Sequence, residues 1–158
     1  SDLGTIVTRD SLDRLRDARP DDIAGLLAII EPLEQDGTLV QRPRERIEQE
    51  VGQFTVLEHD NVIVGCAALY LLDSENAELA CLAVDNDHRE WGYGERLMQA
   101  IEARARAQSI RRLYVLTTRT AHWFIERGYK PAKVEDLPDR KREMYNYQRN
   151  SKVFVKNL

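Results

Sequence analysis

One strand–loop–helix unit near the middle of the chain limits what the chain can fold into. The apolar run at residues 78–84 has the composition of a buried strand. Residues 95–108 have the spacing of a helix with one apolar face, which includes Leu97 and Ile101. A connection with two closely spaced glycines, Gly92 and Gly94, joins the two. The unit indicates a mixed α/β fold built around this connection.

The remaining segments supply strands and helices on either side of this unit. Residues 54–58 and 62–72 are rich in β-forming residues and flank Asp60-Asn61, so they predict a hairpin. We also expect strands at residues 12–17, 78–84, 113–117, 145–148 and 153–155. Helices are expected at residues 23–30, ended by Pro32, at 44–51, and at 121–127, ended by Gly128, with a turn at 35–37.

Size and composition indicate one globular domain. The chain has 158 residues, of which 42% are hydrophobic and 32% charged, enough to bury a core. No apolar run approaches the about 18 residues needed to cross a bilayer, and no signal peptide is evident, so we expect a cytoplasmic protein without a membrane partner. The net charge of −4 argues against nucleic acid as a partner. Cys66 and Cys81 lie in apolar runs and are expected to be buried thiols, and no metal site is expected.

The glycine connection has the chemistry of a phosphate-binding loop. Glycines allow positive φ and close backbone approach, and the first N–H groups of a helix have no intrahelical acceptor. Arg89 adds a cationic side chain with several donors. A Walker loop would end in Gly-Lys-Ser/Thr, and a dinucleotide fingerprint would need a third glycine where Leu97 stands. Without further context, the two glycines also fit a plain strand-to-helix turn.

The pattern Arg-x-x-Gly-x-Gly after the strand resembles the coenzyme-A pyrophosphate loop of the GNAT acetyltransferases. The resemblance implies an α/β fold with a central, mostly antiparallel sheet, helices on both faces and a β-loop-α site for acyl-CoA. It implies acetyl-CoA as cosubstrate, and backbone groups near Leu82 and Val84 that bind it and polarise the acetyl carbonyl. The cofactor-binding residues implied in this way are Leu82, Val84, Arg89, Trp91, Gly92, Tyr93, Gly94 and Glu95.

Longer strings resemble one family of GNAT proteins, bacterial N-acetylglutamate synthase. They cover nearly the whole chain: residues 31–34, 39–42, 65–70, 78–84, 116–124 and 145–152. The resemblance implies transfer of an acetyl group from acetyl-CoA to the α-amine of L-glutamate. In that family the usual bacterial form carries an N-terminal amino-acid-kinase-like domain that binds arginine. The chain has no room for that domain, so arginine regulation is not carried over.

The resemblance also assigns roles within the substrate half. Arg42 and Arg149 match the glutamate-binding arginines, and planar guanidinium groups suit carboxylates. The backbone at Cys81 is expected to help to hold glutamate. Glu78 matches the general base that must deprotonate the amine. Thr117 is the nearest match to the family's Ser or Thr beside the departing thiolate, with Tyr145 and Tyr147 as alternatives.

Several questions stay open at the level of sequence. We expect a single domain over residues 1–158, with residues 1–10 as a linker from a missing N-terminal domain. The sequence leaves open whether the protein forms a homo-oligomer or carries a fused N-terminal domain. Two other functions fit the same residues: a GNAT enzyme that acetylates another amino acid or a peptide amine, and a CoA-binding module that is inactive without a partner domain. Asn86, Trp91 and Ser109 depart from the family pattern without removing a required group.

Overall fold

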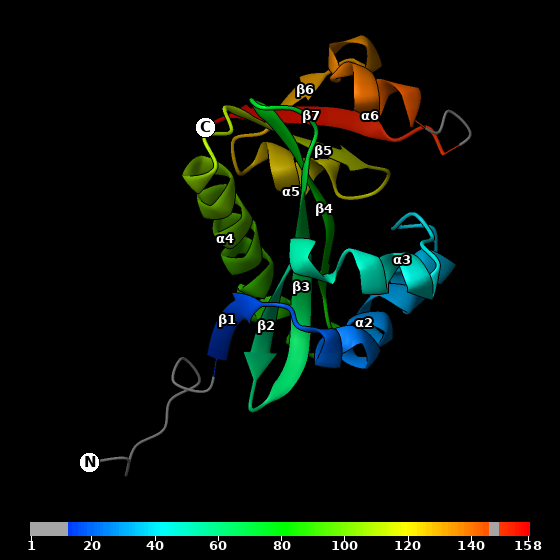
Figure 1. Cartoon of the computed structure of the whole chain (residues 1–158), viewed down its shortest axis with the longest axis vertical. Helices are drawn as coiled ribbons and strands as arrows, with labels where there is room; N and C mark the ends of the chain where they lie inside the picture. The colour runs from blue at the N-terminus through cyan, green and yellow to red at the C-terminus, as the bar shows by residue number, and fades with distance from the viewer. Residues whose placement is uncertain (1–12, 146–148) are drawn as a thin grey trace.

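The computed structural model describes residues 13–145 and 149–158, and within them a seven-stranded sheet lies between helices (Figure 1). The strands are β1 (Asp13–Asp17), β2 (Phe54–His59), β3 (Val62–Leu71), β4 (Asn76–Val84), β5 (Arg112–Thr117), β6 (Lys130–Ala132) and β7 (Lys152–Asn157). The helices are α2 (Ile23–Gln35), α3 (Arg44–Gln49), α4 (Tyr93–Ala107), α5 (Ala121–Ile125) and α6 (Asp139–Glu143). Short 3-10 turns are η1 (Pro20–Asp22), η2 (Val51–Gln53), η3 (Asn86–Trp91) and η4 (Val134–Asp136).

The sheet is mostly antiparallel, as expected. Its strands follow the order β1-β2-β3-β4-β5-β7-β6, and the single parallel neighbours are β4 and β5. The predicted hairpin is confirmed: β2 pairs with β3, and Asp60 and Asn61 both have positive φ, of 53° and 65°. Such a two-residue turn matches the right-handed twist of the strands that it joins.

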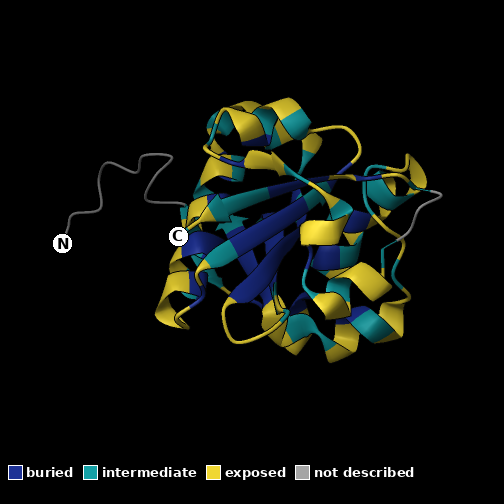
Figure 2. Cartoon of the chain, turned by 90° about the horizontal axis from the view of Figure 1, so that it is seen from above, coloured by how far each residue is buried: buried dark blue, intermediate teal, exposed yellow. Residues whose placement is uncertain are grey.

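Both faces of the sheet are covered, because its central strands alternate between two cores. Ala67 and Leu69 of β3 belong to the cluster that α4 and α5 complete, whereas Cys66 and Ala68 belong to the cluster under α2 and α3. A third, smaller cluster joins Tyr114, Leu137 and Val153 near the C-terminal end of the chain. Figure 2 shows the result, with buried strands between helices whose outer surfaces are exposed.

The prediction that Pro32 ends the helix expected at residues 23–30 is wrong. Helix α2 continues to Gln35, with Pro32 inside its last turn. Proline lacks an N–H, so it removes one intrahelical bond, but its carbonyl still accepts from the amide of Asp36 at 3.2 Å. The expected turn follows, with Gly37 at a φ of 84°. The helix predicted at residues 44–51 divides into α3 and η2, and α5 ends at Ile125, before Gly128.

The C-terminal part of the chain was the least predictable. The structure adds two elements that the sequence pattern did not indicate, β6 and α6. Tyr145, where a strand was expected to begin, lies in no strand, and residues 146–148 are outside the described residues. Residues 1–12, including the predicted linker and the first residue of the first strand, are also outside them.

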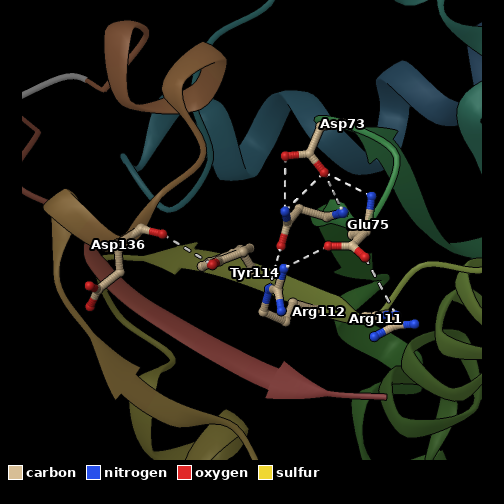
Figure 3. A network of polar contacts seen from close by, with 7 residues as sticks. Asp73, Glu75, Arg111, Arg112, Tyr114 and Asp136 are labelled. Carbon is tan, nitrogen blue, oxygen red and sulfur yellow. Dashed lines mark hydrogen bonds and ion pairs between the residues drawn. The ribbon is translucent and has the colours of Figure 1, made fainter.

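Strands β4 and β5 pair at only one end and then diverge. Both strands lie wholly within the described residues, yet their rungs join only residues 76–78 to residues 112–114. A polar network closes this end (Figure 3): Arg112 donates from Nε to Asn76 Oδ1 at 2.7 Å, and Asp73 Oδ1 accepts from the Asn76 amide at 2.8 Å. The network holds the strands together at the first rung. Because the last rung joins Glu78 to Tyr114, the opening between the strands lies beyond Glu78.

Candidate active site

The loop between β4 and α4 has the backbone geometry that phosphate binding requires. Gly92 caps α4 with a φ of 77°, a conformation that glycine adopts without strain. A Cβ on Gly92 would meet nothing within 4 Å, so the backbone conformation, and not lack of space, explains this glycine. At Gly94 the limit is space, since a Cβ there would lie 3.3 Å from Cζ2 of Trp123. The two glycines therefore have different functions.

A pocket of about 750 Å³, here called the loop pocket, lies beside this connection. Four arginines and three carboxylates line it among its 18 residues, so the positive charge exceeds the negative by one. The lining residues are Leu33, Asp36, Thr38, Leu82, Ala83, Val84, Arg89, Glu90, Gly92, Gly94, Glu95, Arg96, Gln99, Arg119, Thr120, Trp123, Phe124 and Arg127. Helix amides, guanidinium groups and an aromatic wall suit an elongated ligand with phosphates.

Six of the eight residues predicted to bind the cofactor line the loop pocket, and Trp91 and Tyr93 are not among its lining residues. Tyr93 is 1% exposed, and its hydroxyl donates to Asp13 Oδ1 at 2.7 Å. The Trp91 ring packs edge-on against His88, with 4.6 Å between ring centroids. Arg96 and Arg127, which the motif did not indicate, do line the pocket. A helical projection of α4 would have found Arg96, whereas Arg127 needed the tertiary structure.

A bulge in β4 divides the two halves of the site. Cys66 pairs with Ala83 and Ala68 pairs with Ala80, so Cys81 and Leu82 stand opposite one residue of β3. Cys81 has a φ of 54°, which is rare for a residue other than glycine. Cys81 lines a second pocket, and Leu82 lines the loop pocket. The strand therefore presents consecutive residues to two different sites.

The edge of β4 that faces the opening carries backbone donors. The amide of Asp85 donates to Val64 O of β3 at 2.8 Å. Because successive amides of a strand point to opposite edges, the amide of Val84 points toward the side from which β5 has diverged. A donor at this place can bind the carbonyl oxygen of a ligand between the strands.

The second pocket, here called the arginine pocket, measures about 240 Å³. It lies on the face of the sheet that carries Glu78 and Ala80, between the clusters under α2 and around Leu137. Its lining residues are Thr38, Leu39, Val40, Arg42, Arg46, Glu78, Ala80, Cys81, Leu116, Lys141, Met144, Tyr145, Arg149 and Ser151. Four of these are cationic and one is a carboxylate, so the pocket favours a ligand with negative charge and one cationic group.

The structure brings the two predicted substrate arginines into this pocket. The Arg42 guanidinium donates to Val40 O at 3.3 Å and lies 5.9 Å from the centroid of the Tyr70 ring. Its buried Nε has no hydrogen-bond partner among the described residues. Arg149 donates to Thr38 O at 2.6 Å and to Ser151 Oγ at 2.8 Å. Burial and the nearby Arg42 lower the pKa of Arg149, as expected where positive charge accumulates.

Glu78 also lies in the arginine pocket, with a cation that the sequence did not indicate. Its side chain is 8% exposed, and its Oε1 lies 2.8 Å from Nζ of Lys141, which is 17% exposed. Lys141 belongs to α6, which was not predicted. The Pro138-Asp139 pair at the start of this helix was the available signal, because proline and an acidic residue often begin a helix.

Thr117 lies outside both pockets. Its Oγ1 accepts from the amide of Thr120 at 3.0 Å and lies 2.8 Å from Thr120 Oγ1, and the residue is 6% exposed. These bonds favour a structural role in the turn before α5, so its catalytic role stays a prediction. Tyr145 lines the arginine pocket, and its hydroxyl donates to Ser151 O at 2.5 Å. Tyr147 is outside the described residues.

Burial keeps both cysteines in the thiol form. It raises the pKa of Cys81 to about 11 and that of Cys66 well above its ordinary value. Cys66 Sγ donates to Cys81 O at 3.4 Å, which supports the bulge. Within the described residues, no group of three or more His, Cys, Asp or Glu side chains could hold a metal ion. No described helix is both long and apolar enough to span a bilayer, and the cytoplasmic location stays a prediction.

Comparison with known sequences defines the class of protein. The profile of the acetyltransferase (GNAT) family matches residues 19–129, more than half of the chain. The chain therefore belongs to the GNAT acetyltransferase family, and the expected fold is confirmed.

Individual relatives have more specific names than the family profile. The amino-acid acetyltransferase of Azotobacter vinelandii is 54% identical over 98% of this chain, and that of Pseudomonas fluorescens strain Pf0-1 is 52% identical. The chain spans 36% of the length of each. The solved structure of N-acetylglutamate synthase from Neisseria gonorrhoeae, complexed with coenzyme A and N-acetyl-glutamate, matches 92% of this chain and 35% of that chain with a TM-score of 0.89 and 41% identity.

A more distant likeness shows the fold alone. An acetyltransferase from Streptococcus agalactiae is 22% identical, with a TM-score of 0.75, and the match covers 93% of this chain and 99% of that one.

Proposed function

We propose that the chain binds acetyl-CoA in the loop pocket and transfers its acetyl group to the α-amine of L-glutamate bound in the arginine pocket. The observation that carries this proposal is the junction at the bulge, where Cys81 lines one pocket, Leu82 lines the other and Thr38 lines both. Two substrates bound side by side there can react directly. The gonococcal synthase, complexed with coenzyme A and N-acetyl-glutamate, supports the choice of ligands.

The charges of the arginine pocket support glutamate as the acceptor. Glutamate has two carboxylates and one ammonium group, and the pocket has four cationic side chains and one carboxylate. Arg42 and Arg149 are the proposed carboxylate anchors, because each guanidinium can donate two parallel hydrogen bonds. Glu78 is the group of opposite sign that can bind the ammonium. A neutral amino acid would leave at least one of these half-buried guanidinium groups without a carboxylate to bind, which disfavours its binding.

The proposed reaction needs one proton acceptor and one place for the thiolate. Glu78 takes a proton from the ammonium group, directly or through a water, and the neutral amine attacks the thioester carbonyl. The C–N bond forms, the C–S bond breaks and CoA leaves as a thiolate. The amides of Leu82 and Val84 are proposed to bind the carbonyl oxygen as its negative charge develops. Thr117, the family match beside the departing thiolate, lies outside both pockets. Tyr145, the alternative, lines the arginine pocket and is the proposed proton donor once its hydroxyl leaves Ser151 O.

A thiol-release assay with a panel of amino acids tests the proposed function. Purified chain and acetyl-CoA should release free CoA thiol when L-glutamate is added, and far less with aspartate, glutamine or alanine. Equal rates across the panel would leave a GNAT enzyme for another amine. Tight acetyl-CoA binding without turnover would favour the alternative in which the chain is a binding module that needs a partner domain. That alternative has a specific basis, because the chain spans only 36% of the length of these relatives.

The assignment of Glu78 has its own test. Glu78→Gln keeps the size of the side chain but removes the base, so kcat should fall by about a hundredfold or more while acetyl-CoA binding is unchanged. Turnover within a few fold of the unaltered chain would exclude Glu78 as the general base.

A further inference from the structure

The ion pair between Glu78 and Lys141 joins two distant parts of the chain inside the arginine pocket. The two charged atoms are 2.8 Å apart, and the side chains are 8% and 17% exposed. A carboxylate this deeply buried is costly to keep ionised unless a cation or several donors lie beside it. Glu78 is the proposed general base, which must be ionised to accept a proton.

The tertiary structure fixes the position of Lys141 through the strand pair that carries Glu78. Tyr114 is the register partner of Glu78 on β5. Its hydroxyl donates to Asp136 O at 3.1 Å, as Figure 3 shows. Leu137, the next residue, is 2% exposed and packs in the cluster that includes Tyr114. Helix α6 therefore begins against the same rung of the sheet, and its first turn brings Lys141 within 2.8 Å of Glu78.

Arg42 and Arg149 also interact with Glu78 electrostatically, but the following hydrogen bonds from the groups around it have other acceptors. Arg42 donates to Val40 O, and Arg149 donates to Thr38 O and Ser151 Oγ. Tyr70, the register partner on β3, donates to Glu50 Oε1 at 2.7 Å. The groups that surround the carboxylate are Arg42, Arg46, Tyr70, Cys81, Tyr114, Lys141, Tyr145 and Arg149. The ion pair that the structure shows for Glu78 is with Lys141.

We propose that Lys141 is a positioning residue that keeps the Glu78 carboxylate ionised and aimed into the arginine pocket. The proposal rests on the proposed function, in which Glu78 accepts the amine proton. Lys141 acts as the charge partner of Glu78 and neither gives nor takes a proton in the reaction. Without it, the buried carboxylate would take up a proton or turn toward water, and either change removes the base.

Kinetics of Lys141→Met test the proposal. Methionine has a similar length and no charge, so kcat should fall at least about tenfold, and the acidic limb of the kcat/KM profile should move to higher pH. The KM for acetyl-CoA should not change. Lys141→Arg should restore most of the rate, because it restores the charge. Arg140→Met is the matched control: it removes an exposed cation of the same helix and should behave as the unaltered chain.

A rise in the glutamate KM alone, with kcat and the pH profile unchanged, would show that Lys141 contacts the substrate and would overturn the positioning role. If Lys141→Met does not fold, the double variant with Glu78→Gln should fold again, since it buries no unpaired charge. Failure of the double variant to recover would also count against the ion pair.

A measurement without turnover separates this proposal from the proposed function. The carboxyl carbon of Glu78 can be followed by NMR in protein labelled at glutamate, with Glu78→Gln to assign its signal. The pH midpoint of that signal should be higher in Lys141→Met than in the unaltered chain. Equal midpoints would overturn the positioning role whatever the activity, whereas absence of glutamate-dependent thiol release in the unaltered chain would refute only the proposed function.

Discussion

Glu78 of β4 and Tyr114 of β5 face each other on the last rung that joins the two strands. Below this rung the Arg112–Asn76 contact holds the strands together, and above it they diverge. The rung therefore places the proposed base at the point where the sheet opens. The opening is what allows two pockets to meet at Cys81 and Leu82.

The conformation of Gly92 leads to a prediction about cofactor binding. Gly92→Ala should raise the KM for acetyl-CoA several-fold and lower the free energy of unfolding by about 1 kcal/mol, because alanine is strained at positive φ. Gly52→Ala is the control, since a Cβ there also meets nothing within 4 Å and its φ is not positive. Steady-state kinetics and urea unfolding measure both effects. Equal KM values for the two variants would exclude a role for the loop conformation.

Substitution of Arg149 should weaken glutamate binding and leave acetyl-CoA binding almost unchanged. Arg149→Ala removes a charged hydrogen-bond donor from the arginine pocket, so the glutamate KM should rise about tenfold or more with little change in the KM for acetyl-CoA. Arg44→Ala serves as control, because its side chain is 62% exposed and pairs with Glu48 at 3.5 Å on the surface. An unaltered glutamate KM in Arg149→Ala would contradict the assigned role.

Both thiols should be unreactive in the folded chain. Burial raises the pKa of Cys81 to about 11, so almost no thiolate exists at pH 8. Iodoacetamide at that pH should modify neither Cys66 nor Cys81 during a time that suffices for a small thiol, and denaturant should expose both. Mass spectrometry counts the modified sites. Rapid labelling of Cys81 in folded protein would show that the arginine pocket admits the reagent and that the thiol is activated.

The Asp13 carboxylate should make the free energy of unfolding depend on pH in the acidic range. Its side chain is 1% exposed, and burial alone would raise its pKa, but bonds from Tyr93, His59 and Arg96 outweigh burial and lower the pKa. A carboxyl whose pKa is lowered in the folded state stabilises the fold at pH values above its ordinary pKa of about 3.9. This stabilisation is lost as the pH falls through the folded-state pKa.

Asp13→Asn should therefore cost about 2 kcal/mol at pH 7 and clearly less near pH 3, as measured by urea unfolding at the two pH values. Asp60→Asn is the control, because asparagine tolerates the positive φ of that turn residue. The same cost at both pH values would show that the carboxylate charge at Asp13 does not stabilise the fold.

The sequence by itself determined the elements whose cause is local. The β-forming residues and the Asp60-Asn61 turn determined the hairpin, and one apolar face determined α4. The Gly92 and Gly94 pair predicted a loop of the phosphate-binding type, because backbone freedom and helix amides depend on adjacent residues. The strings around Arg42, Glu78 and Arg149 supplied the family resemblance, and the structure places all three residues in one pocket.

Only the tertiary structure decided how the parts of the site meet. Pro32 stays within α2 because packing of Leu26 and Ile30, both fully buried, outweighs the loss of one backbone bond. The short, highly charged α6 has no helical periodicity to detect, and it forms because Leu137 packs on β5 and precedes it. The Glu78–Lys141 pair depends on that packing, because a contact between distant segments leaves no pattern in the local sequence.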